Sequence, residues 1–125
     1  MARVLIVEDD ANLRLILQNV VDQAGHTTYV ATDGQDALNQ VQQEPPDIVV
    51  TDIIMPEKEG IELILSLRKE FPEIRIIAIS GGGQLGADHY LDMAREFGAD
   101  ITIGKPFDKQ CFMDAITELL SPMRS

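Results

Sequence analysis

Hydrophobic residues along the chain follow two alternating spacings. Five short runs, rich in β-branched residues, have the length and composition of buried strands. They are Val4–Val7, Thr27–Ala31, Ile48–Thr51, Ile74–Ile79 and Asp100–Ile103. Between these runs, apolar residues recur every three to four positions, a spacing that predicts amphipathic helices. The pattern therefore predicts strands and helices in strict alternation.

Glycine and proline residues mark the ends of the expected helices. The first helix should stop at Gly25, since glycine is a common residue just past a helix C-terminus. Pro45-Pro46 should end the second helix and Pro72 the third, because proline and the residue before it both disfavour helix. The five expected helices are Leu13–Ala24, Asp33–Gln43, Gly60–Glu70, Ala87–Phe97 and Phe107–Leu120.

Five successive strand–helix units define the expected fold class. Strands joined by helical crossovers form a parallel sheet, and right-handed crossovers place helices on both of its faces. We therefore predict a doubly wound (βα)5 α/β sandwich of the flavodoxin-like type, with strand order 2-1-3-4-5. Because no linker, repeat or low-complexity tract interrupts the pattern, residues 1–125 are expected to form a single domain.

The composition narrows the classes of partner. The 125 residues carry a formal net charge of -11, which disfavours direct binding to nucleic acid or to an anionic membrane. Proteins and cations are the partners that this charge favours. No apolar run approaches the roughly 18 residues of a membrane span, and the start Met1-Ala2-Arg3 is unlike a targeting segment. A cytoplasmic location is therefore expected.

The single cysteine, Cys111, cannot form an internal disulfide. It stands among apolar residues near the C-terminus, and the sequence predicts a buried structural thiol.

Acidic side chains follow two of the apolar runs. Glu8-Asp9-Asp10 comes directly after Val4–Val7, and Asp52 comes directly after Ile48–Thr51. In an open parallel sheet, ligands bind outside the carboxyl ends of the strands, so these carboxylates should converge. Two charges about 4 Å apart repel by roughly 4 kcal/mol at an effective dielectric near 20. The cluster therefore predicts a hard divalent cation, with Mg2+ the best candidate.

Two further polar residues stand at strand ends, Ser80 after the fourth and Lys105 after the fifth. Carboxylates, a hydroxyl and an ammonium group around a cation suit phosphoryl transfer, which depends chiefly on positioning and charge neutralisation. Asp52 is the best candidate nucleophile, since a carboxylate can attack phosphorus to form an acyl phosphate. Asp10 directly precedes a helix, and we expect it to act as an N-cap and not as a metal ligand.

These motifs occur together in one known family. The segment Val4–Asp10, Asp52-Ile53-Ile54-Met55-Pro56 with Gly60, Ser80-Gly81, Gly98-Ala99-Asp100 and Lys105-Pro106-Phe107 follow one another with the spacing of response-regulator receiver domains. Each motif alone is a weak signal, but their order and their places on strand ends make a chance match improbable. The chain resembles this family along its whole length.

The resemblance implies a role for each site residue. Asp52 would accept a phosphoryl group from a phosphohistidine on a sensor histidine kinase or a histidine phosphotransfer protein. Mg2+ would be bound by the side chains of Asp9 and Asp52 and by the backbone carbonyl of Ile54, with Glu8 acting through water.

The phosphorylated state would be read out by other residues. Lys105 would pair with a phosphoryl oxygen, and a cis peptide bond before Pro106 would aim it inward. Ser80 would move to bond another oxygen and carry the signal toward the fourth helix, fifth strand and fifth helix. Signalling would then proceed by phosphorylation-dependent protein–protein contact. The chain would be a signalling domain and not a classical enzyme.

The sequence departs from the family pattern at three points. Thr102 stands where an aromatic residue often reports the phosphorylated state, so the signal is expected to use the loop after Ser80 instead. Ile54 is apolar, and we expect it to limit water access and prolong the phosphorylated state. No output domain follows Leu120, which predicts a stand-alone receiver whose downstream partner is an unknown protein. We expect a monomer, with a weak dimer left open.

Three other functions are weaker alternatives. A metal-dependent phosphatase of the haloacid-dehalogenase type would need a second aspartate at position 54, where the chain has Ile54, and a cap insertion. A flavodoxin-like nucleotide binder would need a phosphate-binding loop where Glu8-Asp9-Asp10 would repel phosphate. A degenerate receiver that only scaffolds proteins commonly lacks the acceptor or the lysine, whereas this chain has both.

Overall fold

The computed structural model describes residues 2–52, 59–80, 96, 98–104 and 107–120, with residues 59, 60 and 80 described through their backbone alone. Five strands and four helices lie in these ranges. The strands are β1 (Arg3–Val7), β2 (Thr27–Ala31), β3 (Ile48–Asp52), β4 (Arg75–Ser80) and β5 (Ile101–Gly104). The helices are α1 (Ala11–Gln23), α2 (Gly34–Gln43), α3 (Glu59–Glu70) and α5 (Lys109–Leu120). The predicted helix over Ala87–Phe97 falls almost wholly outside the described residues.

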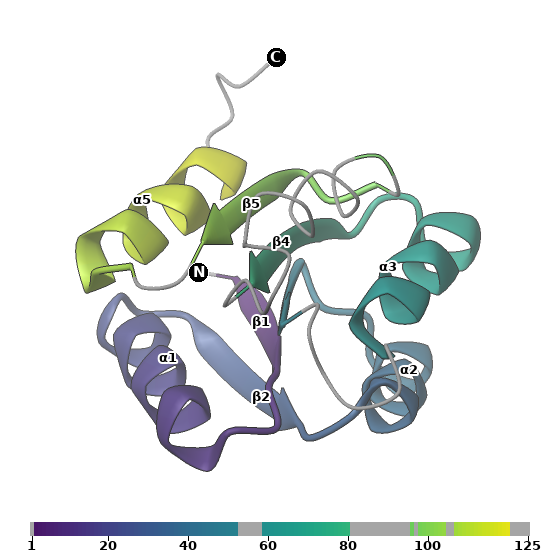
Figure 1. Cartoon of the computed structure of the whole chain (residues 1–125), viewed down its shortest axis with the longest axis horizontal. Coiled ribbons are helices and arrows are strands. Elements are labelled where there is room, and N and C mark those ends of the chain that lie inside the picture. Colours follow the sequence, from purple (N-terminus) through teal and green to yellow (C-terminus); the bar gives the residue numbers. More distant parts are fainter. Residues whose placement is uncertain (1, 53–58, 81–95, 97, 105–106, 121–125) are drawn as a thin grey trace.

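The five strands form one parallel sheet in the order β2-β1-β3-β4-β5. Helices α1 and α5 cover one face of this sheet, and α2 and α3 cover the other (Figure 1). The doubly wound, flavodoxin-like α/β class and the strand order predicted from the sequence are both confirmed.

Two strands begin one residue later than the apolar pattern predicts. Ile74 belongs to the turn after α3, where its amide donates to the carbonyl of Phe71 at 3.1 Å, and β4 begins at Arg75. Asp100 precedes β5 because its carboxylate accepts from the amide of Ile76 at 2.8 Å. In both cases a local polar contact sets the strand boundary.

The core lies on both faces of the sheet, because successive strand residues point to opposite sides. On β1, Val4 and Ile6 pack in the cluster beneath α1 and α5, whereas Leu5 and Val7 pack in the cluster beneath α2 and α3. All four are at most 1% exposed. This two-sided burial explains why the strands read as continuous apolar runs and not as alternating ones.

Cys111 is exposed, so the prediction of a buried thiol is wrong. The buried residues of α5 are Phe112, Ala115, Ile116 and Leu119, which share one face of the helix. Position 111 is rotated by about 100° from Phe112 around the helix axis, which places it at the margin of that face. Helix geometry therefore places the thiol in solvent.

The aspartate before α1 acts as its N-cap, as predicted. The Asp10 carboxylate accepts hydrogen bonds from the backbone amides of Asn12 at 2.9 Å and Leu13 at 3.3 Å. Asp10→Ala is expected to lower the free energy of unfolding by about 1 kcal/mol, as is usual for the loss of an N-cap. Denaturant melts would measure it. Asp33→Ala at the start of α2, where the carboxylate accepts from the amide of Asp36, is a matched control of similar size. An unchanged stability for Asp10→Ala would contradict the cap assignment.

Candidate functional site

The carboxyl ends of β1, β3 and β4 meet at one edge of the sheet and bring the predicted acidic residues together. Val7 of β1 pairs with Thr51 of β3, so Glu8 and Asp52 follow as the next residues of neighbouring strands. Both are buried, with exposed fractions of 2% for Glu8 and 5% for Asp52. Two buried carboxylates on adjacent strand ends form the centre of the candidate site.

Glu8 is fixed in place by contacts from three directions. Its backbone amide donates to the carbonyl of Ala31 at 3.2 Å, which ties it to the end of β2. Its Oε2 accepts from the backbone amide of Asp10 at 3.1 Å. The Arg14 Nη1 of α1 donates to the Glu8 carbonyl at 2.8 Å. These contacts hold the Glu8 carboxylate over the loop that follows β1.

Arg14 is a residue that the sequence analysis missed. It brings a guanidinium group to the backbone of the acidic loop and is half-buried beside it. The sequence offers one signal for this role. Arg14 is a basic residue six positions after Glu8, near the start of a helix that begins at this edge of the sheet. Arg14 adds positive charge where carboxylates cluster, which reduces their mutual repulsion.

Asp9 and Asp10 have separate environments, although they are adjacent in sequence. Asp9 is exposed in the loop after β1, so its carboxylate is accessible to an incoming cation. Asp10 is occupied as the N-cap of α1. The structure therefore distinguishes the residue available to a metal from the one that stabilises a helix.

The remaining predicted site residues are described only in part. Ser80 ends β4, and its backbone pairs with Gly104, the last residue of β5. Lys105 and Pro106 follow Gly104 in the sequence and lie outside the described residues, as does Ile54 after Asp52. The strand register thus brings Ser80 to the same edge as Glu8 and Asp52, whereas the roles given to Lys105 and Ile54 stay predictions.

The donor chemistry of the site fits a hard cation. Glu8, Asp9 and Asp52 supply carboxylate oxygens, the ligands that Mg2+ prefers. Among the residues with described positions, no three acidic, histidine or cysteine side chains form a group arranged to hold a metal ion. The described part of the site therefore contributes ligands of the right type without forming a closed metal site.

Thr102 lies within β5, at the position where the sequence departs from the family pattern. It pairs with Ala78 of β4 and is half-buried. A threonine side chain here is short, so the rotation of a large ring cannot occur at this position.

A set of hydrogen bonds from the half-buried Arg68, here called the Arg68 clamp, explains the Gly98-Ala99-Asp100 motif. Arg68 of α3 donates from Nε to the carbonyl of Gly98 at 2.6 Å and from Nη2 to Oδ2 of Asp100 at 2.5 Å. Its Nη1 donates to the carbonyl of Pro72 at 2.9 Å. The Asp100 carboxylate also accepts from the amide of Ile76. One guanidinium therefore joins α3, the turn before β4 and the segment before β5.

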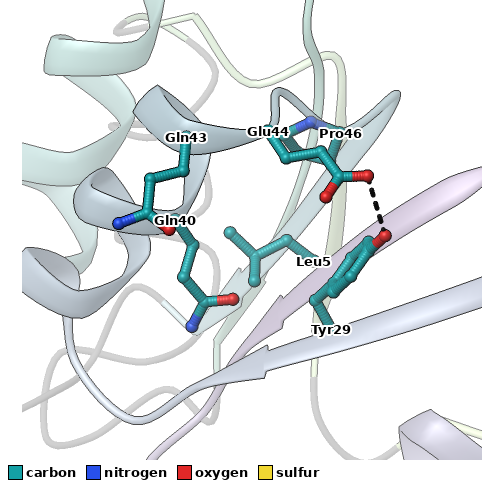
Figure 2. A pocket seen from close by; sticks show the side chains of 6 residues that line it. All are labelled: Leu5, Tyr29, Gln40, Gln43, Glu44 and Pro46. Atoms are coloured by element: carbon teal, nitrogen blue, oxygen red, sulfur yellow. Dashed lines mark hydrogen bonds between the residues drawn. The ribbon is translucent and has the colours of Figure 1, made fainter.

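A small recess of about 370 Å³ lies between α2 and the edge strand β2, away from the acidic edge (Figure 2). Tyr29 donates from its hydroxyl to Oε1 of Glu44 at 3.0 Å, and Arg3 donates to the same oxygen at 3.1 Å. Leu5, Gln40, Gln43 and Pro46 also line it. Glu44, the one acidic residue among the described residues of this lining, is therefore bound by the Arg3 guanidinium and the Tyr29 hydroxyl.

The hydrogen bond to Glu44, aided by partial desolvation and by the negative charge of Glu44, raises the pKa of Tyr29 above its usual value of 10.0. Because the folded-state pKa is raised, the interaction stabilises the fold below pH 10 and is lost as pH rises through the raised pKa. Glu44→Ala is expected to return this pKa toward 10.0. Phenolate absorbance in a Tyr90→Phe background, which leaves Tyr29 as the sole tyrosine, would measure it. Gln43→Ala is the control, and an equal shift there would refute the assignment to Glu44.

The fold and the acidic edge together define a class of protein. A flavodoxin-like sandwich with one buried acidic residue directly after β1 and another at the end of β3 is an α/β domain equipped for phosphate chemistry at the carboxyl ends of its strands. The family model described as "Response regulator receiver domain" matches residues 4–117. The chain belongs to the response regulator receiver family.

Relatives of known function cover nearly the whole chain. Sporulation initiation phosphotransferase F of Bacillus subtilis is 32% identical over 98% of this chain and 96% of its own length. Chemotaxis protein CheY of Thermotoga maritima is 36% identical over 94% of this chain and 96% of its own length. The crystal structure of the receiver domain of NtrX from Brucella abortus superposes with a TM-score of 0.87 at 27% identity, covering 94% of this chain and 97% of that one.

Family membership identifies the chain as a signalling domain of two-component systems, whose members interact with histidine kinases or phosphotransfer proteins and are generally Mg2+-dependent. It favours the receiver interpretation over the phosphatase and the flavodoxin-like nucleotide binder. Within the described ranges, no helix has both the length and the apolar character needed to cross a membrane.

Proposed function

We propose that this receiver accepts a phosphoryl group on Asp52 from a sensor histidine kinase or a histidine phosphotransfer protein. The observation that carries the proposal is the burial of Asp52 at the end of the central strand β3, next to the buried Glu8 that directly follows β1. Asp9 and Asp52, with the backbone carbonyl of Ile54, would bind Mg2+, and Glu8 would act through water. When bound, the cation neutralises charge on the phosphoryl oxygens.

The transfer step balances without a further reactant. An Asp52 carboxylate oxygen forms a bond to phosphorus while the bond between phosphorus and the donor histidine nitrogen breaks, and that nitrogen keeps the electron pair. Lys105 pairs with one phosphoryl oxygen of the product. Ser80, at the end of β4, bonds another and carries the signal toward β5 and α5 through the loop that follows it, since Thr102 offers no aromatic ring.

We also propose that the chain acts as a single-domain receiver in the cytoplasm, as a monomer that signals by contact with a downstream protein and does not bind DNA directly. Two relatives, phosphotransferase F and CheY, match it over 96% of their own lengths, which supports a single-domain type. The formal charge of -11 opposes direct DNA binding. Ile54 is proposed to slow hydrolysis of the acyl phosphate.

The proposal is tested by incubating the protein with acetyl phosphate, with and without Mg2+, and recording the intact mass. We expect one phosphoryl group to be added only when Mg2+ is present and to be lost at alkaline pH, as acyl phosphates are. A following time course in donor-free buffer measures the lifetime of the product. Addition that is unaffected by removal of Mg2+ with a chelator would contradict the metal-dependent mechanism, and no addition in any arm would overturn the proposed function.

A further inference from the structure

A groove of about 740 Å³ lies at the opposite edge of the sheet from the acidic site, where the strands begin. Its walls come from segments that are far apart in sequence: the turn between α3 and β4, the loop before β3 and the last turn of α5. Apolar residues of these segments form much of its lining. They include Pro46, Phe71, Pro72, Ile74, Leu119 and Leu120.

The charged residues of the groove are mostly acidic. Of the described residues that line it, Asp47, Glu70 and Glu73 are acidic and Arg75 alone is basic. Glu70 and Glu73 are exposed, and within the described part of the chain neither forms an ion pair. The groove therefore presents two carboxylates on its rim that have no cationic partner among the described residues.

The helices add to this negative potential. Each helix of a doubly wound sheet runs antiparallel to the strands, so α2, α3 and α5 all end at the edge where the groove lies. A helix C-terminus carries about half a negative charge on its last carbonyl groups. The ends at Gln43, Glu70 and Leu120 therefore reinforce the field of the rim carboxylates.

The neighbouring recess in Figure 2 offers a comparison, because there the chain itself supplies a cation to an acidic residue. There Glu44 accepts a hydrogen bond from Tyr29 (Figure 2) and forms an ion pair with Arg3. Pro46 separates the recess from the groove, since it lines both. Across this boundary no described residue forms an ion pair with Glu70 or Glu73, so both carboxylates are available to a basic ligand.

We infer that this groove docks a short, extended, basic segment of a partner protein. Side chains of an extended segment alternate between two faces, so apolar residues can enter the groove while intervening Lys or Arg residues meet Glu70 and Glu73. The five-residue strand β3 separates the groove from Asp52 by about 17 Å. A partner bound here would leave the phosphoryl-accepting edge open, and the inference does not depend on the proposed function.

The test uses synthetic peptides of about eight residues, which are about 26 Å long when extended. Lys or Arg alternates with Leu or Pro in one set, and Glu replaces the basic residues in the matched set. Binding to the isotope-labelled full chain is followed by amide chemical shifts. We expect the basic set alone to shift the amides of Phe71, Glu73 and Leu119. The double variant Glu70→Arg/Glu73→Arg should weaken binding at least about tenfold.

The control is Glu62→Arg/Glu118→Arg, which makes the same change in net charge at exposed helix positions outside the groove. It should retain most of the affinity. Equal losses in both double variants would show unspecific charge attraction and overturn the inference, as would the absence of binding by any basic peptide at about 1 mM.

Two other occupants give distinct outcomes. Concentration-dependent shifts of the same amides without peptide would identify a second copy of the chain as the occupant. Peptide binding that appears only after deletion of residues 121–125 would identify the chain's own terminal segment. Either result would overturn docking of a partner.

Discussion

Asparagine in place of Asp52 is expected to abolish phosphoryl uptake from acetyl phosphate while leaving the fold intact. The amide has nearly the same shape as the carboxylate, so the side chain can stay in its buried position at the end of β3. It is not a nucleophile toward phosphorus, and it offers one neutral oxygen in place of a charged ligand to Mg2+. We expect uptake to fall by at least about a thousandfold, the scale on which loss of a covalent nucleophile acts.

Intact mass measured over time, in parallel with the far-ultraviolet circular dichroism spectrum, would separate loss of chemistry from loss of structure. Asp10→Asn is the matched control, because asparagine caps helices as well as aspartate does and the residue lies one position from the metal-binding candidate Asp9. It should retain uptake. Phosphoryl addition to Asp52→Asn at the rate of the unaltered chain would show that another residue is the acceptor.

The same residues show what the sequence can predict about the site. Glu8 and Asp52 could be identified because each directly follows or ends a run of buried strand residues, and parallel strands place such ends at one edge. The cap role of Asp10 was also predictable, since a capping bond reaches only two or three residues along the chain. Both predictions depend on signals that the sequence contains directly: contacts between residues close in sequence, and the alternation of strands and helices.

Features that depend on how the elements pack against one another were not predictable in the same way. Arg14 reaches the Glu8 carbonyl only because α1 packs against the sheet at a particular angle, which no spacing in the sequence specifies. The exposure of Cys111 similarly depends on which face of α5 meets the sheet. The Gly98-Ala99-Asp100 motif was recognised through the family resemblance alone, and its physical basis, the Arg68 clamp, joins residues about thirty positions apart.

That clamp makes Gly98 a position where an added methyl group should be strongly destabilising. Gly98 has a φ of +124°, a backbone conformation that L side chains rarely adopt, and an added Cβ would lie 2.3 Å from Cγ of Arg68. Three hydrogen bonds pin the Arg68 guanidinium, so its aliphatic part cannot move aside without breaking them. We expect Gly98→Ala to lower the free energy of unfolding by about 4 kcal/mol, from backbone strain and loss of the clamp.

Two comparisons separate these causes in denaturant melts. Gly25 also has a positive φ, +93°, but a Cβ there would meet nothing within 4 Å, so Gly25→Ala should cost only the backbone term of about 1 to 2 kcal/mol. Arg68→Ala removes both the clamp and the clash. In the Gly98→Ala background, Arg68→Ala should therefore destabilise the fold by about 1 to 2 kcal/mol less than it does in the unaltered chain, because in that background it also removes the clash between the added methyl group and the Arg68 side chain. Additive effects of the two substitutions, within about 0.5 kcal/mol, would mean that the close approach of Gly98 and Arg68 contributes nothing to the requirement for glycine.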